Sequence, residues 1–172
     1  ITVIASSIGG TVTSSATVCS GANSGTLTLA GEAGSILNWE SSIDAGATWA
    51  PIVNTTNTQP YNNIALNTSY RAVVQNGACT AANSTIAVLT VDAPTVGGAL
   101  ASDATVCASA NGGTISLSGQ TGAIQNWESS TDNGLTWSAI ANTSASQNYT
   151  DLLDTTLYRS LIKNGVCSST YS

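Results

Sequence analysis

Hydrophobic and polar residues alternate along short stretches of this chain, and clusters of Gly, Asn and Ser separate the stretches. Alternation with a period of two places every second side chain on the same face of a β-strand. Each stretch is therefore expected to cover one side of a core and to end at a turn. In the first half of the chain the pattern predicts strands at 10–14, 25–30, 35–42, 47–53, 58–63, 69–75 and 85–91.

Seven short strands in about 88 residues are typical of an immunoglobulin-like β-sandwich, in which two sheets enclose a core. Trp39 and Tyr70 are the largest residues on the expected inward faces, and Trp127 and Tyr158 occupy the same places in the second half. We expect these four side chains to fill the cores. The inward-facing sets are Leu27 with Leu29, Leu37 with Trp39, and Tyr70 with Ala72 and Val74.

The two halves of the chain are copies of one repeat, offset by 88 positions without insertion. Residues 8–84 and 96–172 share 36 identities in 77 positions, which excludes chance similarity. The fold class expected is therefore all-β, with two tandem immunoglobulin-like sandwich repeats of about seven strands each in an elongated array. We expect domains at 8–91 and 97–172, joined by a short linker at 92–96.

The ends of the chain fall inside the repeat pattern. Residues 1–3 align with 89–91, so residues 1–7 are expected to be the end of a preceding repeat and its linker. Ser172 aligns with Ser84, so the second repeat is expected to lack its last strand. Such a repeat exposes an unpaired strand edge. We expect the natural chain to continue with further repeats.

Composition narrows the range of functions. Only 7% of the residues are charged, the net charge is −6, and three residues in all are Lys or Arg. A nucleic-acid binder needs a cationic surface, and anionic membranes attract basic segments, so neither partner is expected. No apolar run is long enough to span a bilayer, and direct membrane insertion is not expected.

Two cysteines occur in each repeat, separated by 60 positions in both cases. Because each repeat is expected to close on itself, we predict the bridges Cys19–Cys79 and Cys107–Cys167, tying two loops at one end of each sandwich. A zinc site of four Cys is disfavoured, since the sequence has neither C-x-x-C spacing nor His. Disulfides indicate an oxidising, extracytoplasmic compartment.

The pattern S-x-D-x-G-x-T-W occurs once in each repeat, at 42–49 and 130–137. It is similar to the Asp box of sialidase propellers, but those enzymes need an Arg cluster and a Tyr nucleophile. We interpret the motif as a self-stabilised hairpin, in which the Asp accepts backbone N–H bonds, the Gly adopts positive φ and the Trp packs beneath. The residues concerned are Asp44, Gly46, Trp49, Asp132, Gly134 and Trp137.

Catalytic chemistry is not expected, and we predict that the protein is not an enzyme. Without His there is no Ser–His triad or imidazole base, and the sequence predicts no two acidic side chains that face each other across a cleft. No cofactor and no metal site are predicted. A calcium site at Asp44, Asp92 or Asp103 stays an alternative, because calcium prefers oxygen ligands.

The motifs T-V-C-S-G, W-E-S-S-x-D-x-G-x-T-W and Y-R-A-V-V-Q-N-G-x-C together resemble the immunoglobulin-like repeats of giant cell-surface adhesins in Bacteroidota, of the gliding-motility SprB type. The resemblance covers essentially the whole chain. It implies type IX secretion, display at the extracellular cell surface as a long filament, and movement by motility machinery. Asp154-Thr155-Thr156 also matches the short O-glycosylation signal of that phylum.

Three functions are compatible with these patterns. The leading hypothesis is a structural stalk repeat of a large extracellular adhesin that serves surface attachment or gliding, with neighbouring repeats as its main partners. The second is a module that binds surface polysaccharide or another polymer through exposed Trp49 and Trp137. The third is a pilus-like subunit whose missing strand is supplied by another chain.

Overall fold

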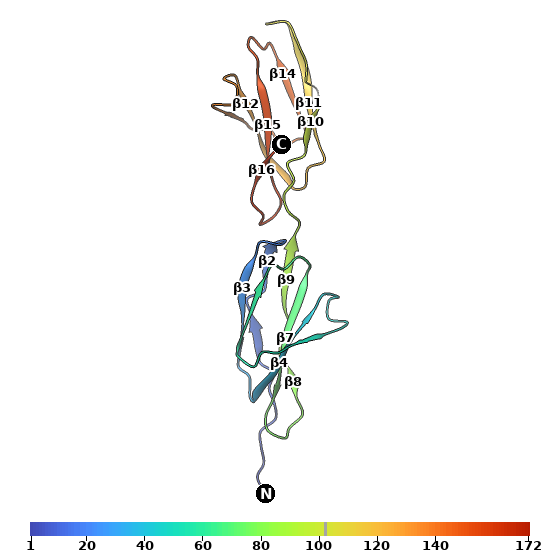
Figure 1. The fold of residues 1–172 in the computed structure, drawn as a ribbon, viewed down its shortest axis with the longest axis vertical. Helices are drawn as coiled ribbons and strands as arrows, with labels where there is room; N and C mark the ends of the chain where they lie inside the picture. Colours follow the sequence, from blue (N-terminus) through green and yellow to red (C-terminus); the bar gives the residue numbers. More distant parts are fainter. Residues whose placement is uncertain (102) are drawn as a thin grey trace. The chain divides into compact units, whose positions relative to one another are not determined.

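The computed structural model describes residues 1–101 and 103–172, which form two compact β-sheet units, 1–92 and 93–172. The described residues contain strands and turns and no helix, as the alternating pattern predicts. Figure 1 shows the strands of each unit. Both units are immunoglobulin-like β-sandwich repeats, called here repeat 1 and repeat 2.

Repeat 1 has two sheets, and its strands occupy nearly every stretch in which the sequence alternates. One sheet has the order β1-β3-β6; in the other, the order is β2-β9-β7-β4-β5, with β8 also pairing with β7. The strands are β1 (Thr11–Thr13), β2 (Ala16–Cys19), β3 (Ser24–Ala30), β4 (Ser35–Ser42), β5 (Ala50–Ile52), β6 (Thr58–Asn62), β7 (Thr68–Gln75), β8 (Ala82–Asn83) and β9 (Ala87–Asp92).

Repeat 2 reproduces this arrangement with fewer strands. Its sheets have the orders β10-β11-β14 and β13-β12-β15-β16. Positions equivalent to β9 fall after Ser172, and the described residues that correspond to β2 form no strand. The strands are β10 (Ala99–Ala101), β11 (Gly112–Ser118), β12 (Ala123–Ser130), β13 (Ser138–Ile140), β14 (Ser146–Thr150), β15 (Leu157–Lys163) and β16 (Thr170–Tyr171).

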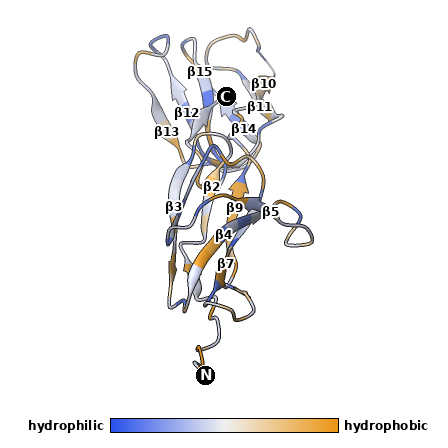
Figure 2. Cartoon of the chain, turned by 60° about the horizontal axis from the view of Figure 1, so that its bottom comes forward, coloured by the Kyte–Doolittle hydropathy of each residue, from blue (hydrophilic) through white to orange (hydrophobic). Residues whose placement is uncertain are grey.

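Strand β9 joins two parts of repeat 1 that no other strand connects. It runs parallel to β2, with Ala16 opposite Leu89, and antiparallel to β7, with Thr68 opposite the same Leu89. The side chains of Ala87 and Leu89 are fully buried as a result. Figure 2 shows the hydrophobic character of β9. The strand therefore closes the core while holding β2 in the sheet.

A β-bulge changes one predicted inward face. The register of β4 against β7 shifts between Ile36 and Asn38, which leaves Leu37 exposed while Ile36 packs against the core. The prediction that Leu37 and Trp39 face the same way is therefore wrong, because an extra residue reverses the alternation. Repeat 2 has Gln125 at the equivalent of Leu37, so the polar residue there was a sign of exposure.

An Asn-Gly pair between two strands favours a type I′ hairpin, but the turn at Asn76-Gly77 after β7 is of another type. The N–H of Cys79 donates to the carbonyl of Asn76 over 3.0 Å, so Gly77 and Ala78 are the central residues. Only Gly77 of these two has positive φ, at 54°, whereas a type I′ turn requires it at both. The Asn side chain is left free to bind elsewhere.

Candidate functional site

The predicted disulfide pairing within each repeat is wrong. The thiols of Cys79 and Cys107 are free, whereas Cys19 and Cys167 are disulfide-bonded. The reason is visible in the strand register. Cys19 lies opposite Asp92, at the end of β9, whereas Cys79 follows the opposite end of β7. About ten residues of extended strand separate these two ends, which corresponds to roughly 30 Å. A disulfide needs Cα atoms within about 7 Å.

Each repeat therefore has two ends with different cysteines. We call the end at which the chain enters the repeat the entry pole, and the end at which β9 leaves repeat 1 the exit pole. At the entry pole, the Cys79 thiol donates to the carbonyl of Ala5 over 3.3 Å. In repeat 2 the Sγ of Cys167 lies 3.3 Å from the carbonyl oxygen of Ala93, the residue equivalent to Ala5.

The linker that enters each repeat is docked on the Asn-Gly turn by the same hydrogen bonds. The Asn76 side chain donates to Ala5 over 3.0 Å, and its N–H donates to the Ser7 hydroxyl over 2.9 Å. In repeat 2, Asn164 donates to Ala93 over 2.8 Å and to the Thr95 hydroxyl over 3.0 Å. The Asn of this turn thus binds the linker that enters the repeat, through its side chain and its backbone N–H.

At the exit pole, one Asn side chain holds the cysteine loop in each repeat. Asn23 donates to the carbonyls of Cys19 and Ile64, both over 2.7 Å. In repeat 2, Asn111 donates to the carbonyl of Cys107 over 2.7 Å and to that of Leu152 over 2.8 Å. The two exit-pole cysteines therefore have the same backbone support. The sequence analysis did not identify these Asn residues, although an Asn occurs four positions after the exit-pole Cys in both repeats.

The Asp boxes form the self-stabilised turns that their sequences suggest. The Ser42 hydroxyl bonds to Asp44 over 2.7 Å and accepts the N–H of Gly46 over 2.8 Å. The hydroxyl and the N–H of Thr48 both donate to the Asp44 carboxylate. Gly46 has φ of 91°. All the donors belong to the turn itself, so the carboxylate serves the local fold.

Electrostatics of the Asp boxes follow from these hydrogen bonds. Donation from the Thr48 side chain, then from its backbone, and from Ser42 holds the pKa of Asp44 well below its usual range. The same contacts from Thr136 and Ser130 lower the pKa of Asp132 to about 2. Both carboxylates are therefore charged at neutral pH. Repeat 2 reproduces the turn, and its Gly134 has φ of 83°.

The Trp of each Asp box packs against an Arg, not only beneath its own turn. The Arg71 guanidinium lies 4.0 Å from the centroid of the Trp49 ring, and its Nε contacts Glu40 over 2.6 Å. In repeat 2, Arg159 stacks 3.9 Å from Trp137 and 3.7 Å from Tyr171, and pairs with Glu128. The ring faces are thus covered in part by a cation of the same repeat.

Both predicted core Trp side chains are fully buried. The Trp39 indole N–H donates to the carbonyl of Thr56, and that of Trp127 donates to Ser144, each over 2.9 Å. Their Tyr companions differ, because Tyr70 is buried whereas Tyr158 is only half-buried. Burial raises the pKa of both phenols.

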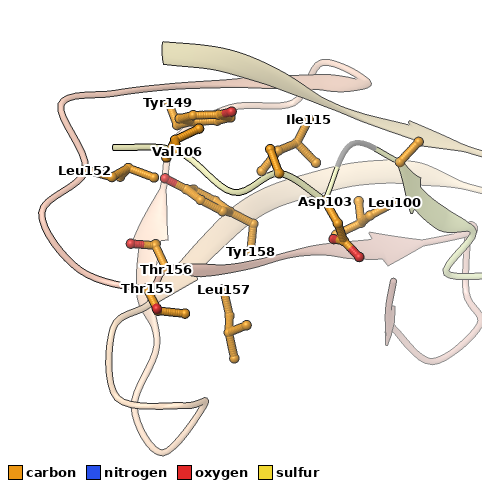
Figure 3. Close-up of a pocket in the computed structure, with 12 residues that line it drawn as sticks. Leu100, Asp103, Val106, Ile115, Tyr149, Leu152, Thr155, Thr156, Leu157 and Tyr158 are labelled. Carbon is orange, nitrogen blue, oxygen red and sulfur yellow. The ribbon is translucent and has the colours of Figure 1, made fainter. Parts of the chain in front are cut away.

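Repeat 2 has an open groove of about 380 Å³ beside Tyr158. Val106 and Ala104 line one wall, and Thr156 and Tyr158 of the β15 region line the other. Figure 3 shows Val106 between the rings of Tyr149 and Tyr158. These residues are the counterparts of those that flank β9 in repeat 1, so the groove lies where a closing strand lies in the other repeat.

Other kinds of site receive no support from the described part of the chain. Within residues 1–101 and 103–172, no group of three or more Cys, Asp or Glu side chains is placed to hold a metal ion. The same ranges contain no helix long and apolar enough to cross a membrane. Every buried side-chain N or O atom described has a hydrogen-bond partner, so none is left orphaned for a ligand.

Comparison with known proteins gives a family and a fold. A family model described as domain of unknown function DUF8696 matches the chain twice, at residues 8–93 and 96–172. No curated protein matches the chain in sequence.

Among solved structures, domains A168–A170 of titin match with a TM-score of 0.51 and 11% identity, covering 96% of this chain and 66% of the titin fragment. The four N-terminal Ig domains of Dscam1 match with a TM-score of 0.42 and 13% identity, covering 97% and 44%. The CbhA fibronectin(III)-like modules of Clostridium thermocellum match with a TM-score of 0.36 and 12% identity, covering 99% and 90%. At this identity, the titin likeness shows the fold alone.

Proposed function

Because this chain belongs to the DUF8696 family and contains two tandem copies of its domain, we propose that it is a structural stalk segment of a large extracellular surface adhesin. The observation that carries the proposal is the repeated docking of the linker. Residues 5 and 93 accept the same hydrogen bond from Asn76 and Asn164, respectively. A unit that binds the chain entering it is suited to repetition in series.

Three further features support a stalk over a catalytic or ligand-binding role. The polar side chains of the Asp boxes bind within their own turns. The Trp49 and Trp137 rings are half-buried and stacked on Arg, which leaves less ring surface for a sugar than the polymer-binding hypothesis requires. Disulfide-bonded cysteines support an oxidising compartment outside the cytoplasm. We propose no enzymatic activity.

The identity of the adhesin is a finer proposal, which rests on the resemblance to gliding-motility adhesins of Bacteroidota. On this proposal the protein is exported by type IX secretion and extends from the cell surface. Its partners are neighbouring repeats, together with surface polysaccharide or motility machinery contacted elsewhere in the filament.

The length of the native protein tests the stalk. Antibodies raised against residues 1–172 are used to detect the protein in cell-surface fractions on denaturing gels and to label cells for electron microscopy. We expect a polypeptide many times the 17.2 kDa of this segment, and label at the ends or along filaments outside the cell. A native protein of only two repeats, or one confined to the cytoplasm, contradicts the proposal.

The groove of repeat 2 favours a second candidate function, assembly by strand donation from another chain. Val106 and Tyr158 line a space whose counterpart in repeat 1 is filled by Ala87–Asp92. A strand with this sequence pattern from a second copy would complete the sheet. Denaturing gels of the native protein distinguish the two functions, because polymers held only by donated strands dissociate in denaturant, whereas a continuous stalk keeps its length.

A further inference from the structure

The chain enters repeat 1 at one pole and leaves it at the other, and this route sets the direction in which tension acts on its strands. The incoming linker is held at the entry pole, where the Asn76 side chain donates to the carbonyl of Ala5 over 3.0 Å. Strand β9 ends at the exit pole with Asp92, opposite Cys19 of β2. Because β2 and β9 are parallel, tension between Ala5 and Asp92 pulls β2 toward the entry pole and β9 toward the exit pole. The pair is therefore loaded in shear.

The hydrogen bonds between β2 and β9 lie across this load. The register pairs Ala16–Cys19 of β2 with residues 89–92 of β9. The bonds of a parallel ladder are evenly spaced, so a shear load acts on all of them at once and several must break together. Two strands that are pulled apart from one end lose their bonds one after another instead.

Further hydrogen bonds extend this pairing at both ends of β2. Before the strand, the Ser15 hydroxyl accepts the N–H of Val88 over 3.0 Å. After the strand, the N–H of Ser20 donates to the carbonyl of Asp92 over 2.9 Å. The segment 15–20 is thus bonded to the β9 side of the sheet over a longer stretch than the strand itself.

The position of the pair in the sandwich makes it the contact that must break first. Leu89 is fully buried and Ala16 packs against the same core cluster. Strand β9 is also paired with β7, whereas β2 stands at the edge of its sheet and has β9 as its single neighbour there. The chain before β2 is held by β1, which pairs with β3 over three residues. Repeat 1 can therefore extend from its N-terminal side only after β2 has separated from β9.

We propose that repeat 1 bears tensile load and that the β2–β9 pair is its mechanical clamp, the contact whose rupture limits unfolding under tension. The proposal rests on the stalk function, which it deepens by naming the bonds that carry the load within a repeat. Tension of this kind arises in a surface stalk whenever its attached end is pulled away from the cell.

Single-molecule pulling in two directions tests the clamp without changing the fold. DNA handles are attached to the 172-residue chain through an azide-bearing amino acid in place of Thr2 and Ala93, which loads the β2–β9 bonds in shear. In a second version the handles replace Ala22 and Ala93, which follow the exit-pole ends of β2 and β9, so that the two strands are separated from one end. All three side chains are exposed. Reducing buffer keeps the cysteines as thiols, so that no disulfide bypasses the load.

The two directions should give different opening forces. At the same loading rate we expect a several-fold higher force with handles at 2 and 93 than with handles at 22 and 93. Matching denaturation midpoints of the two versions, measured without tension, show that the difference comes from the direction of the load and not from stability. Equal opening forces in the two directions overturn the proposal.

A matched pair of proline substitutions tests which bonds carry the load. The N–H groups of a strand alternate in direction, so that of Val18 points to β9, as that of Ser20 does, whereas that of Thr17 points to the open edge. Val18→Pro removes one donor from a short ladder and should lower the opening force in the shear direction by roughly a third. Thr17→Pro should leave the force nearly unchanged, because an edge strand tolerates Pro where the N–H faces solvent. Equal losses from both substitutions contradict the clamp.

The direction test decides the matter even if Val18→Pro prevents folding, because it leaves every residue of the ladder in place. The clamp and the stalk also fail independently. If the opening force is the same in both directions but the native protein is a long surface filament, the stalk stands and the clamp is wrong. If the forces differ as expected but the native protein has only two repeats, the clamp stands and the stalk is wrong.

Discussion

Repeats 1 and 2 have the same residue at 36 of 77 aligned positions, yet their cores differ in completeness. Val12 and Leu27 of repeat 1 are buried, while their counterparts Leu100 and Ile115 are only half-buried. The difference follows from one strand, because Leu89 of β9 occupies the place that is a groove in repeat 2. In repeat 1, the last strand thus serves both the burial of the core and the pairing of β2.

The largest effect is expected from the core Trp that the two repeats share. Truncating Trp39 or Trp127 to Ala should cost about 3–5 kcal/mol in the free energy of unfolding, because each side chain is fully buried. Denaturant titration monitored by circular dichroism measures the loss. Since repeat 2 has the smaller core, Trp127→Ala should unfold it outright while repeat 1 remains folded. Equal, small losses from both substitutions would show that these residues do not hold the cores.

A matched pair on equivalent strands sharpens the comparison. Leu27→Ala should cost about 2–5 kcal/mol, as expected for a fully buried Leu. Ile115→Ala should cost clearly less, since its side chain borders the open groove. Both are measured as the shift in the denaturation midpoint of the repeat concerned. If the Ile115 variant loses as much as the Leu27 variant, the groove is closed in solution.

Supplying the closing strand should remove the difference. Extending the chain beyond Ser172 with a copy of Thr85–Pro94 should raise the free energy of unfolding of repeat 2 by about 2–3 kcal/mol, from roughly 100 Å² of apolar surface newly covered at 25 cal/mol/Å². The control extension has Asp in place of the residue equivalent to Leu89. Equal stabilisation by both extensions would indicate that burial in the groove is not the cause.

The sequence pattern predicted the positions of most strands, but the end of the sandwich at which each cysteine lies was not predicted correctly. The alternating pattern located seven strands, while β2 and β8 were missed because they are short and depend on β9 and β7 for pairing. The disulfide prediction failed because it took the two cysteines of a repeat to lie at the same end of the sandwich. Strands that alternate in direction place a cysteine before the second strand and one after the sixth at opposite ends, so a count of strand directions would have excluded the Cys19–Cys79 bridge.

The stacked Arg side chains should matter less than the core. Arg71→Ala is expected to cost about 1 kcal/mol, since its pair with Glu40 and its contact with Trp49 lie near the surface. Arg159→Ala should cost slightly more, because Arg159 also stacks on Tyr171. Thermal unfolding of both variants, with Arg71→Lys as the control for charge alone, measures the difference. A loss at Arg71 that exceeds the loss at Arg159 contradicts this order.

The smallest effect is expected from acidification. The pKa of Asp44 and Asp132 is lower in the folded chain than in the unfolded chain, so the stabilisation is complete above about pH 4 and is lost as pH falls toward 2. Asp44→Asn and Asp132→Asn should flatten the pH dependence of the melting temperature in this window, each in its own repeat. A slope that both variants leave unchanged would assign acid sensitivity to other carboxylates.

Hydrogen exchange resolved by residue tests most directly the claim that the last strand closes each repeat. In repeat 1, the amides of Thr68–Gln75 should be protected, because this strand pairs with β4 on one side and with β8 and β9 on the other. In repeat 2, the amide of Tyr158, which faces the groove, should exchange much faster than the amides of Leu157 and Arg159, which face β12, and addition of the peptide Thr85–Pro94 should slow its exchange. Equal protection of β7 and β15 in the monomeric 172-residue chain without the peptide would contradict the account.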